Sequence, residues 1–374
     1  MQSVSPRGAL PVNRGWLRPV FVLAVVLPVY LAVVLLQNGL NPLALAEIGD
    51  GFVNGQPIST QTGYDGQFSY WLAIDPSPAA AGTHFDVPAY RYQRILYPLL
   101  ARWLAFGQAG LVPWTLIVVN LVAQLGGVLA VEAWLTAHGV SRWYALTYGL
   151  WVGLVGAIRL DLAEPLSYAL VAAGLLAQYR QRVWLAALCL ALATFAKETA
   201  LVFWFALMVW AALARQRPAL LALGLAQLPF VIWQVVLWRW FGAPGLASGG
   251  WMATPFEWLP YMGLWRIAAV SVPAFFLLAA ISLPIGVLPS VWGLAAAAGR
   301  LLQRDFSPAV LALGANAALI AVLPFSTFRE PLALVRLATG LVLATILFGA
   351  HIGSRRVLNY SLFWTAGLFL LVSR

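Results

Sequence analysis

Eleven apolar runs fill most of the sequence and restrict what the chain can fold into. An α-helix needs roughly 20 apolar residues to cross the hydrocarbon core of a bilayer, and several runs reach that length. Of the 374 residues, 62% are hydrophobic and only 9% are charged, whereas about 25% are charged in soluble domains. So few charged side chains cannot cover a water-soluble globule of this size. The sequence therefore predicts a single all-α polytopic membrane domain over residues 1–374.

The apolar runs are interpreted as about eleven transmembrane helices. They cover residues 19–37, 110–137, 143–158, 162–178, 183–196, 199–214, 218–240, 267–299, 308–325, 337–352 and 357–373. We interpret residues 183–214 as a hairpin turning at Lys197 and Glu198, because one helix of this length would extend about 48 Å, beyond a core of about 30 Å. Residues 143–178 are interpreted likewise, with the turn at 159–165. The charged tips of these short helices are expected to line a recessed cavity.

The positions of the arginines predict the orientation in the membrane. Three arginines precede the first apolar run, so residues 1–18 are predicted to be cytoplasmic, because basic residues concentrate in cytoplasmic loops. Alternation of the spans then places the two long polar segments, 38–109 and 241–266, outside the cytoplasm. The recessed cavity is expected to open to the same side. Arginine outnumbers lysine 21 to 1, which is typical of a GC-rich bacterial genome and points to a bacterial inner (cytoplasmic) membrane.

The first outer segment contains the principal candidate for a reactive group. A short amphipathic helix is predicted for residues 66–74, because Phe68, Trp71 and Leu72 fall at helical spacing. Asp65 would lie just before the N-terminus of this helix, where the helix dipole favours a charged carboxylate. That position suits a helix cap as well as a general base, and the pattern leaves both interpretations open.

Other candidate site residues lie in the outer segments and at the hairpin tips. Six cations form the predicted phosphate-binding group: Arg91, Arg94, Arg159, Lys197, Arg329 and Arg336. Four side chains are predicted to bind the acceptor or the sugar: Tyr64, Gln67, Tyr92 and Tyr97. Four acids are assigned supporting roles: Asp50, Asp161, Glu164 and Glu198. The alternatives are arginines that snorkel to the interface, an interfacial aromatic belt and ion pairs that only lock the hairpins together.

This combination of groups favours glycosyl transfer from a polyprenyl-phosphate donor. Cations at membrane depth suit a lipid-linked phosphate, and a carboxylate can accept the proton of an attacking hydroxyl. The expected partners are the lipid-linked sugar donor and membrane lipids. Nucleic acid is not an expected partner, because the arginines are scattered between apolar runs. A secondary transporter or lipid flippase and a noncatalytic membrane assembly factor remain as alternatives.

No cofactor is predicted. The single cysteine, Cys189, and three widely separated histidines offer no metal-ligand pattern. The sequence also contains no Asp-x-Asp motif and no Asp-Asp pair, and it leaves a divalent metal requirement undecided.

Two short motifs carry a family resemblance. Tyr64-Asp65-Gly66-Gln67-Phe68 and Tyr97-Pro98-Leu99-Leu100 resemble the early outer-loop motifs of the polytopic GT-C glycosyltransferases, particularly the mannosyltransferases of glycolipid-anchor synthesis. The resemblance implies a core of membrane helices with juxtamembrane helices in the first outer loop. It also implies that Asp65 is the catalytic base of an inverting transfer and that the outer-loop arginines hold the donor phosphate.

Overall fold

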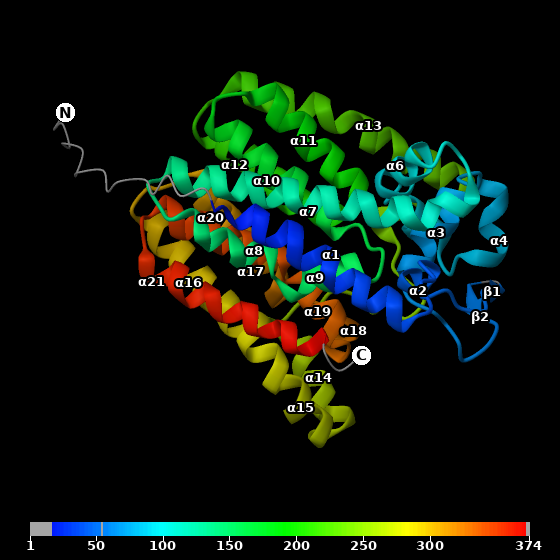
Figure 1. Ribbon diagram of the computed structural model, residues 1–374. Helices are drawn as coiled ribbons and strands as arrows, with labels where there is room; N and C mark the ends of the chain where they lie inside the picture. The colour runs from blue at the N-terminus through cyan, green and yellow to red at the C-terminus, as the bar shows by residue number, and fades with distance from the viewer. Residues whose placement is uncertain (1–16, 54, 372–374) are drawn as a thin grey trace.

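The computed structural model describes residues 17–53 and 55–371, and it is helical almost throughout (Figure 1). Within these residues the only sheet is an antiparallel pair formed by β1 (Phe52–Val53) and β2 (Gln56–Pro57). The prediction of an all-α fold is therefore confirmed. Most of the predicted cytoplasmic N-terminus, residues 1–16, lies outside the described residues.

Five helical stretches are long and apolar enough to cross a membrane, judged by length and composition. They are α1 (Pro19–Gln37), η2 with α7 (Ala109–Ala137), α13 (Arg217–Phe241), α15 through α16 (Val272–Leu302) and α19 with α20 (Pro331–His351). Shorter apolar helices accompany them, among them α17 (Pro308–Ala321). These lengths and compositions are those of an integral membrane protein. The long stretches are fewer than the eleven spans predicted.

Prolines and tight turns divide several of the predicted runs into shorter pieces. Proline lacks the N–H that the helical ladder needs and clashes with the preceding turn, and Pro284 lies in such an interruption. The pieces are η3 (Arg142–Tyr144), α8 (Ala145–Gly149), α9 (Val152–Arg159), α14 (Met262–Val270), α15 (Val272–Ser282), the π-helical η6 (Leu283–Val287), α16 (Leu288–Leu302), α21 (Arg355–Ser361) and η7 (Leu362–Leu371). The predicted count of eleven treats each run as one helix and does not anticipate these breaks.

Both predicted helical hairpins are present. The first connects α9 to α10 (Glu164–Tyr179), and the second connects α11 (Val183–Ala196) through η4 (Glu198–Ala200) to α12 (Leu201–Leu213). The chain reverses at Lys197, as the length argument requires. Helices α10 and α11 pack against each other, which brings the tips of the two hairpins together.

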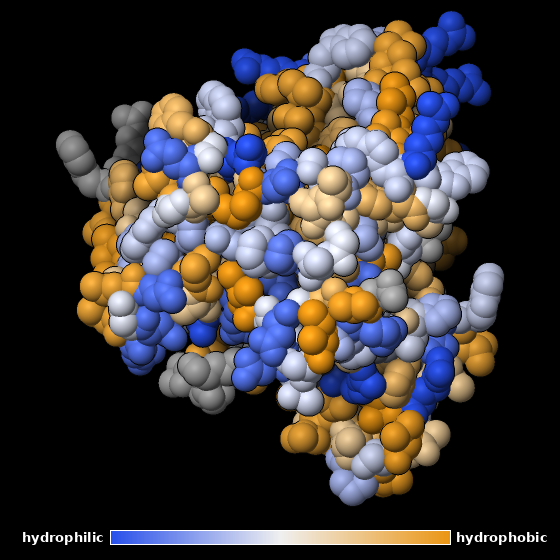
Figure 2. All heavy atoms as spheres, turned by 90° about the vertical axis from the view of Figure 1, so that its right-hand side faces the viewer, coloured by the Kyte–Doolittle hydropathy of each residue, from blue (hydrophilic) through white to orange (hydrophobic). Residues whose placement is uncertain are grey.

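The segment between α1 and α7 folds into short elements gathered at one end of the molecule, on the right of Figure 1. They are α2 (Leu43–Ala46), β1, β2, α3 (Gly66–Ile74), η1 (Pro78–Ala80), α4 (Ala81–His84), α5 (Pro88–Tyr92), α6 (Leu96–Leu104) and η2 (Ala109–Leu111). Helix α3 has the predicted bounds. Figure 2 looks onto this end, where hydrophilic side chains lie among apolar ones.

Helix α20 (Thr339–His351) is the centre of the apolar core. All but its last residue are buried, and α7, α10 and α17 pack around it. The helix continues from α19 (Pro331–Leu337), which follows α18 (Phe325–Arg329) and packs on α9. The remaining element is η5 (Gly245–Ala247), which follows α13. The core therefore holds α19 in place beside the first hairpin.

Candidate functional site

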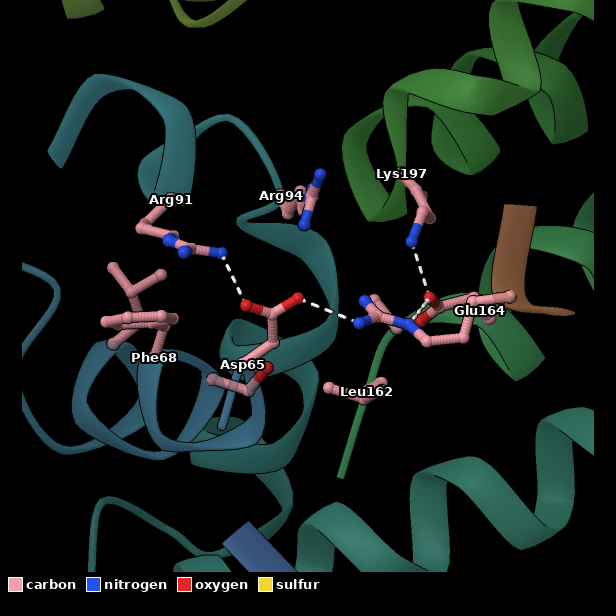
Figure 3. Close-up of a pocket in the computed structure, with 11 residues that line it drawn as sticks. Asp65, Phe68, Arg91, Arg94, Leu162, Glu164 and Lys197 are labelled. Atoms are coloured by element: carbon pink, nitrogen blue, oxygen red, sulfur yellow. Dashed lines mark hydrogen bonds and ion pairs between the residues drawn. The ribbon is translucent and has the colours of Figure 1, made fainter. Parts of the chain in front are cut away.

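A small charged cavity of about 30 Å³ lies where α3, the two hairpin tips and α19 meet (Figure 3). Phe68 and Leu72 of α3 form part of an apolar wall, and Leu162 of the first hairpin turn lies opposite. Six ionisable side chains line the cavity: Asp65, Arg91, Arg94, Glu164, Lys197 and Arg336. The predicted base, Asp65, and one predicted supporting acid, Glu164, thus lie in the same cavity. The other four are predicted phosphate-binding cations, and the six side chains come from chain segments far apart in the sequence.

Asp65 occupies the N-cap position of α3, yet its carboxylate does not cap the helix. One oxygen, Oδ1, accepts a hydrogen bond from Nη1 of Arg91 at 2.9 Å, and the other, Oδ2, accepts one from Nη1 of Arg336 at 2.9 Å. Burial alone would raise the pKa of Asp65, but the guanidiniums of Arg91, Arg336 and Arg94 outweigh it and hold that pKa well below its usual range. Of the two interpretations left open by the sequence, the cap is not observed.

Arg91 is fixed from two further directions. Its Nε and Nη2 donate to the two carboxylate oxygens of Asp86, both at 2.7 Å, and its guanidinium carbon lies 3.8 Å from the centre of the Phe68 ring. Asp86 in turn accepts from the backbone N–H of Trp251 at 3.1 Å. A guanidinium held in this way is preorganised for a second anion, because the fork geometry leaves Nη1 directed into the cavity.

Glu164 joins the two hairpins to α19. Its Oε1 accepts from Nζ of Lys197 at 2.5 Å and from Nε of Arg336 at 2.6 Å. Arg336 also donates from Nη1 to the hydroxyl oxygen of Tyr64 at 3.0 Å, and that hydroxyl donates to Glu330 at 2.6 Å. The side chain of Glu164 is only 1% exposed. Such a buried carboxylate requires its cations, because an unpaired charge at this depth is strongly destabilising.

The fourth cation, Arg94, is paired with Glu198. Its Nε and Nη2 donate to the two carboxylate oxygens at 2.8 and 2.6 Å, and Nη2 also contacts the Tyr90 hydroxyl. Each of the four cations lining the cavity therefore has at least one carboxylate partner within the described residues. An anion that enters this cavity must compete with a carboxylate already bound there.

Close backbone packing sets the position of Asp65. A Cβ atom on Gly66 would lie 2.1 Å from the carbonyl oxygen of Leu160, in the turn of the first hairpin. A Cβ atom on Gly63 would lie 2.4 Å from the carbonyl oxygen of Glu47 and 2.5 Å from the backbone nitrogen of Gly49. Gly63 has a φ of +65°, and this left-handed conformation suits glycine. The N-terminus of α3 thus rests directly on the hairpin that supplies Glu164.

Gly66→Ala is expected to destabilise the protein by about 1–3 kcal/mol, despite the better helix propensity of alanine. The added methyl group must displace either α3 or the turn at Leu160, since the contact is with backbone. Thermal unfolding of the purified variant in detergent measures the effect. Gly82→Ala, in a position with nothing within 4 Å of the added Cβ, is the control. Equal melting temperatures for the two variants would contradict the packing argument.

Two predicted phosphate-binding arginines lie outside this cavity. Arg159 lines a separate cavity of about 180 Å³, where its Nη1 lies 3.8 Å from Glu47. The chain reverses between Arg159 and Glu164 through Asp161, whose φ is +50°, so the two ends of the turn line different cavities. Arg329 contacts the sulfur of Met252 at 3.8 Å. Of the four supporting acids, Glu164 binds Lys197 and Arg336, and Glu198 binds Arg94.

Three of the predicted acceptor or sugar ligands have buried side chains and do not line the cavity. Gln67 accepts from the Gly49 N–H at 3.1 Å and donates to the Thr62 carbonyl at 2.8 Å. The hydroxyl groups of Tyr92 and Tyr97 donate to backbone carbonyls of Ser77 and Leu116 at 2.7 and 3.0 Å. These contacts bind Gln67 and Tyr92 within the outer segment and Tyr97 to α7, as buried polar groups require partners. The fourth residue, Tyr64, reaches Arg336.

The other two supporting acids also lie elsewhere. Asp50, beside the small hairpin, accepts from the Ser59 hydroxyl. Asp161 is fully buried, and neither of its carboxylate oxygens has a hydrogen-bond partner in the structure. A carboxylate in such surroundings is expected to be neutral, since burial penalises the charged form.

Sequence reasoning missed two acids that organise the site. Asp86 precedes α5 and accepts a hydrogen bond from Arg91. Glu330 precedes α19 and accepts a hydrogen bond from the hydroxyl of Tyr64. Neither pair has a helical spacing, so no periodic pattern indicates it. The one local signal is an acid placed shortly before a helix that begins with proline, at Pro88 and Pro331.

Among the described residues, no group of three or more His, Cys, Asp or Glu side chains is arranged to hold a metal ion. Comparison with protein-family models, curated proteins and solved structures found no match for this chain.

Proposed function

We propose that this protein is an integral-membrane glycosyltransferase that moves a sugar from a polyprenyl-phosphate donor to an acceptor hydroxyl. The observation that carries the proposal is the single cavity in which Asp65 lies among Arg91, Arg94, Lys197 and Arg336. Transfer of a sugar from a phosphate leaving group needs a carboxylate as base and fixed cations that bind the phosphate, and this cavity contains both.

The cations stabilise the departing phosphate. Charge on the leaving oxygen grows as the bond to the anomeric carbon breaks, and fixed donors aimed at that charge commonly contribute several kcal/mol. The guanidiniums of Arg91 and Arg336 are held by Asp86 and Glu164. They therefore need little reorganisation when the donor binds.

Asp65 acts as the general base. The acceptor hydroxyl gives its proton to Asp65, its oxygen bonds to the anomeric carbon, and the bond from that carbon to the phosphate oxygen breaks. Polyprenyl phosphate leaves with the electron pair. Attack from the face opposite the phosphate inverts the anomeric configuration. The resemblance of the Tyr64-Asp65-Gly66 motif to the GT-C glycosyltransferases supports this assignment.

The proposed orientation puts the cavity on the extracytoplasmic side of a bacterial inner membrane, with the N-terminus in the cytoplasm and about eleven spans. The concentration of arginines in the loops opposite the cavity supports it.

The second candidate is a noncatalytic assembly factor. Pairing of each lining cation with a carboxylate favours it, because a purely structural ion-pair network has the same pattern. The open cavity beside Asp65, with 29% of that side chain exposed, favours the enzyme.

Purified protein in lipid nanodiscs, incubated with labelled polyprenyl-phosphate sugars and an envelope extract as acceptor, tests the proposal. We expect a labelled product and the release of polyprenyl phosphate. Folded protein that binds the donors and yields neither product would favour the noncatalytic role.

A further inference from the structure

The two oxygens of Asp65 occupy the positions that a bound phosphate needs. Each oxygen accepts from the Nη1 of a different arginine, Arg91 on one side and Arg336 on the other, both at 2.9 Å. Two oxygens of a phosphodiester present a similar pair of acceptors, and guanidinium groups bind carboxylate and phosphate with the same geometry. A phosphate and Asp65 therefore cannot both occupy these two donors.

Asp65 is the carboxylate most open to exchange. Its side chain is 29% exposed, against 0% for Asp86 and 1% for Glu164. Asp86 holds Arg91 through two hydrogen bonds of 2.7 Å, and Glu164 holds Arg336 at 2.6 Å. Both arginines thus remain in place when Asp65 is displaced, so the site does not depend on Asp65 for its shape.

We propose that Asp65 and the phosphate of the donor occupy the same two guanidinium positions in turn, so that the donor releases the base. This inference rests on the proposed function, since it takes the phosphate of a lipid-linked sugar as the ligand. In the structure, Asp65 is bound to Arg91 and Arg336. When the phosphate takes both Nη1 donors, Asp65 is freed beside the sugar.

The charges of the cavity favour a singly charged phosphate. Four cations line it, and three carboxylates besides Asp65 contact these cations: Asp86, Glu164 and Glu198. The four cations therefore keep one positive charge without a carboxylate partner once Asp65 no longer pairs with them, which matches a phosphodiester. A pyrophosphate linkage would add a second negative charge without a partner cation, which is costly in a partly buried site.

Release also changes the basicity of Asp65. The guanidiniums lower its pKa while they bind it, and a carboxylate without them, next to a phosphate, has a higher pKa because like charges repel. Asp65 is then a stronger base with the donor present than without it.

The direct test is equilibrium binding of farnesyl methyl phosphate, a singly charged phosphodiester, to protein in nanodiscs. Asp65→Asn removes the competing charge and is expected to tighten binding by about tenfold, within the roughly 5- to 150-fold range common for coupled sites. Asp65→Glu keeps the charge and is expected to bind about as the wild type does. A folded Asp65→Asn protein with equal or weaker affinity would overturn the proposal.

The wild-type protein gives a second test that does not depend on a variant. Binding that raises the pKa of Asp65 is coupled to proton uptake, so affinity should increase as pH falls from about 6 towards about 4. The probe does not titrate in this range, and the pKa of Lys197, which burial lowers to about 8, lies above it. The charged or titratable groups around Asp65 and its arginine partners are Tyr64, Asp86, Arg91, Arg94, Glu164, Lys197, Glu198, Glu330 and Arg336. Affinity that is independent of pH would overturn the proposal.

Both measurements use binding alone. A protein that transfers no sugar but passes these tests would refute the proposed function and keep the exchange. A protein that transfers sugar but fails both binding tests would support the proposed function and refute the exchange.

Discussion

Asp65→Asn is expected to lower the turnover of sugar transfer by about 100- to 10,000-fold, the range that general-base catalysis commonly provides. The amide retains the size of the side chain and can still accept from one guanidinium, but it has no basicity for the proton of the acceptor. Initial rates with a saturating polyprenyl-phosphate sugar measure the change. The fall should be in kcat, because the proposed exchange predicts tighter binding of the donor by the same variant.

Asp75→Asn is the matched control. Asp75 follows the other end of α3, is exposed, and accepts from the backbone N–H of Ser77 at 2.9 Å. Its substitution should leave the rate close to that of the wild type. Turnover of Asp65→Asn above about one tenth of wild type would remove Asp65 from the proton transfer, since even a modest general base contributes more than this.

Arg336→Gln is expected to destabilise the protein by about 3–5 kcal/mol, as is usual when one partner of a buried ion pair is removed. The variant deprives Glu164 and Asp65 of the same guanidinium. Glu164 then shares its buried position with Lys197 alone. Thermal unfolding in detergent should show a large fall in melting temperature, accompanied by loss of donor binding.

Arg266→Gln supplies the comparison for Arg336. Arg266 pairs with Glu257 at 2.7 Å, but its side chain is 48% exposed, and surface pairs contribute about 0–1 kcal/mol. If Arg336→Gln loses as little stability as Arg266→Gln, the buried network around Glu164 adds little to the stability of the protein.

The sequence predicts the elements that depend on local spacing. The bounds of α3 follow from the positions of Phe68, Trp71 and Leu72, and the turn at Lys197 follows from the length of a bilayer-spanning helix. Sequence reasoning also groups Asp65 with Lys197 and Arg336, and these three side chains line one cavity.

Partner choice within the site depends on contacts that sequence spacing does not encode. Asp161 reverses the chain in a left-handed conformation, so Arg159 and Glu164 line different cavities. Tyr92 and Tyr97 donate to backbone carbonyls, a role that composition cannot distinguish from sugar binding. Among the described residues, five helical stretches are long and apolar enough to cross a membrane, fewer than the eleven apolar runs, because an apolar run indicates burial in lipid or protein but not an unbroken helix.

Helix α19 forms part of the wall between two cavities of different character. Arg336 lines the charged one, while the preceding residue, Val335, and Leu332 line the larger apolar one beside Arg159. A hydrophobic small molecule bound against Val335 would therefore contact the helix that carries Arg336 without entering the charged cavity.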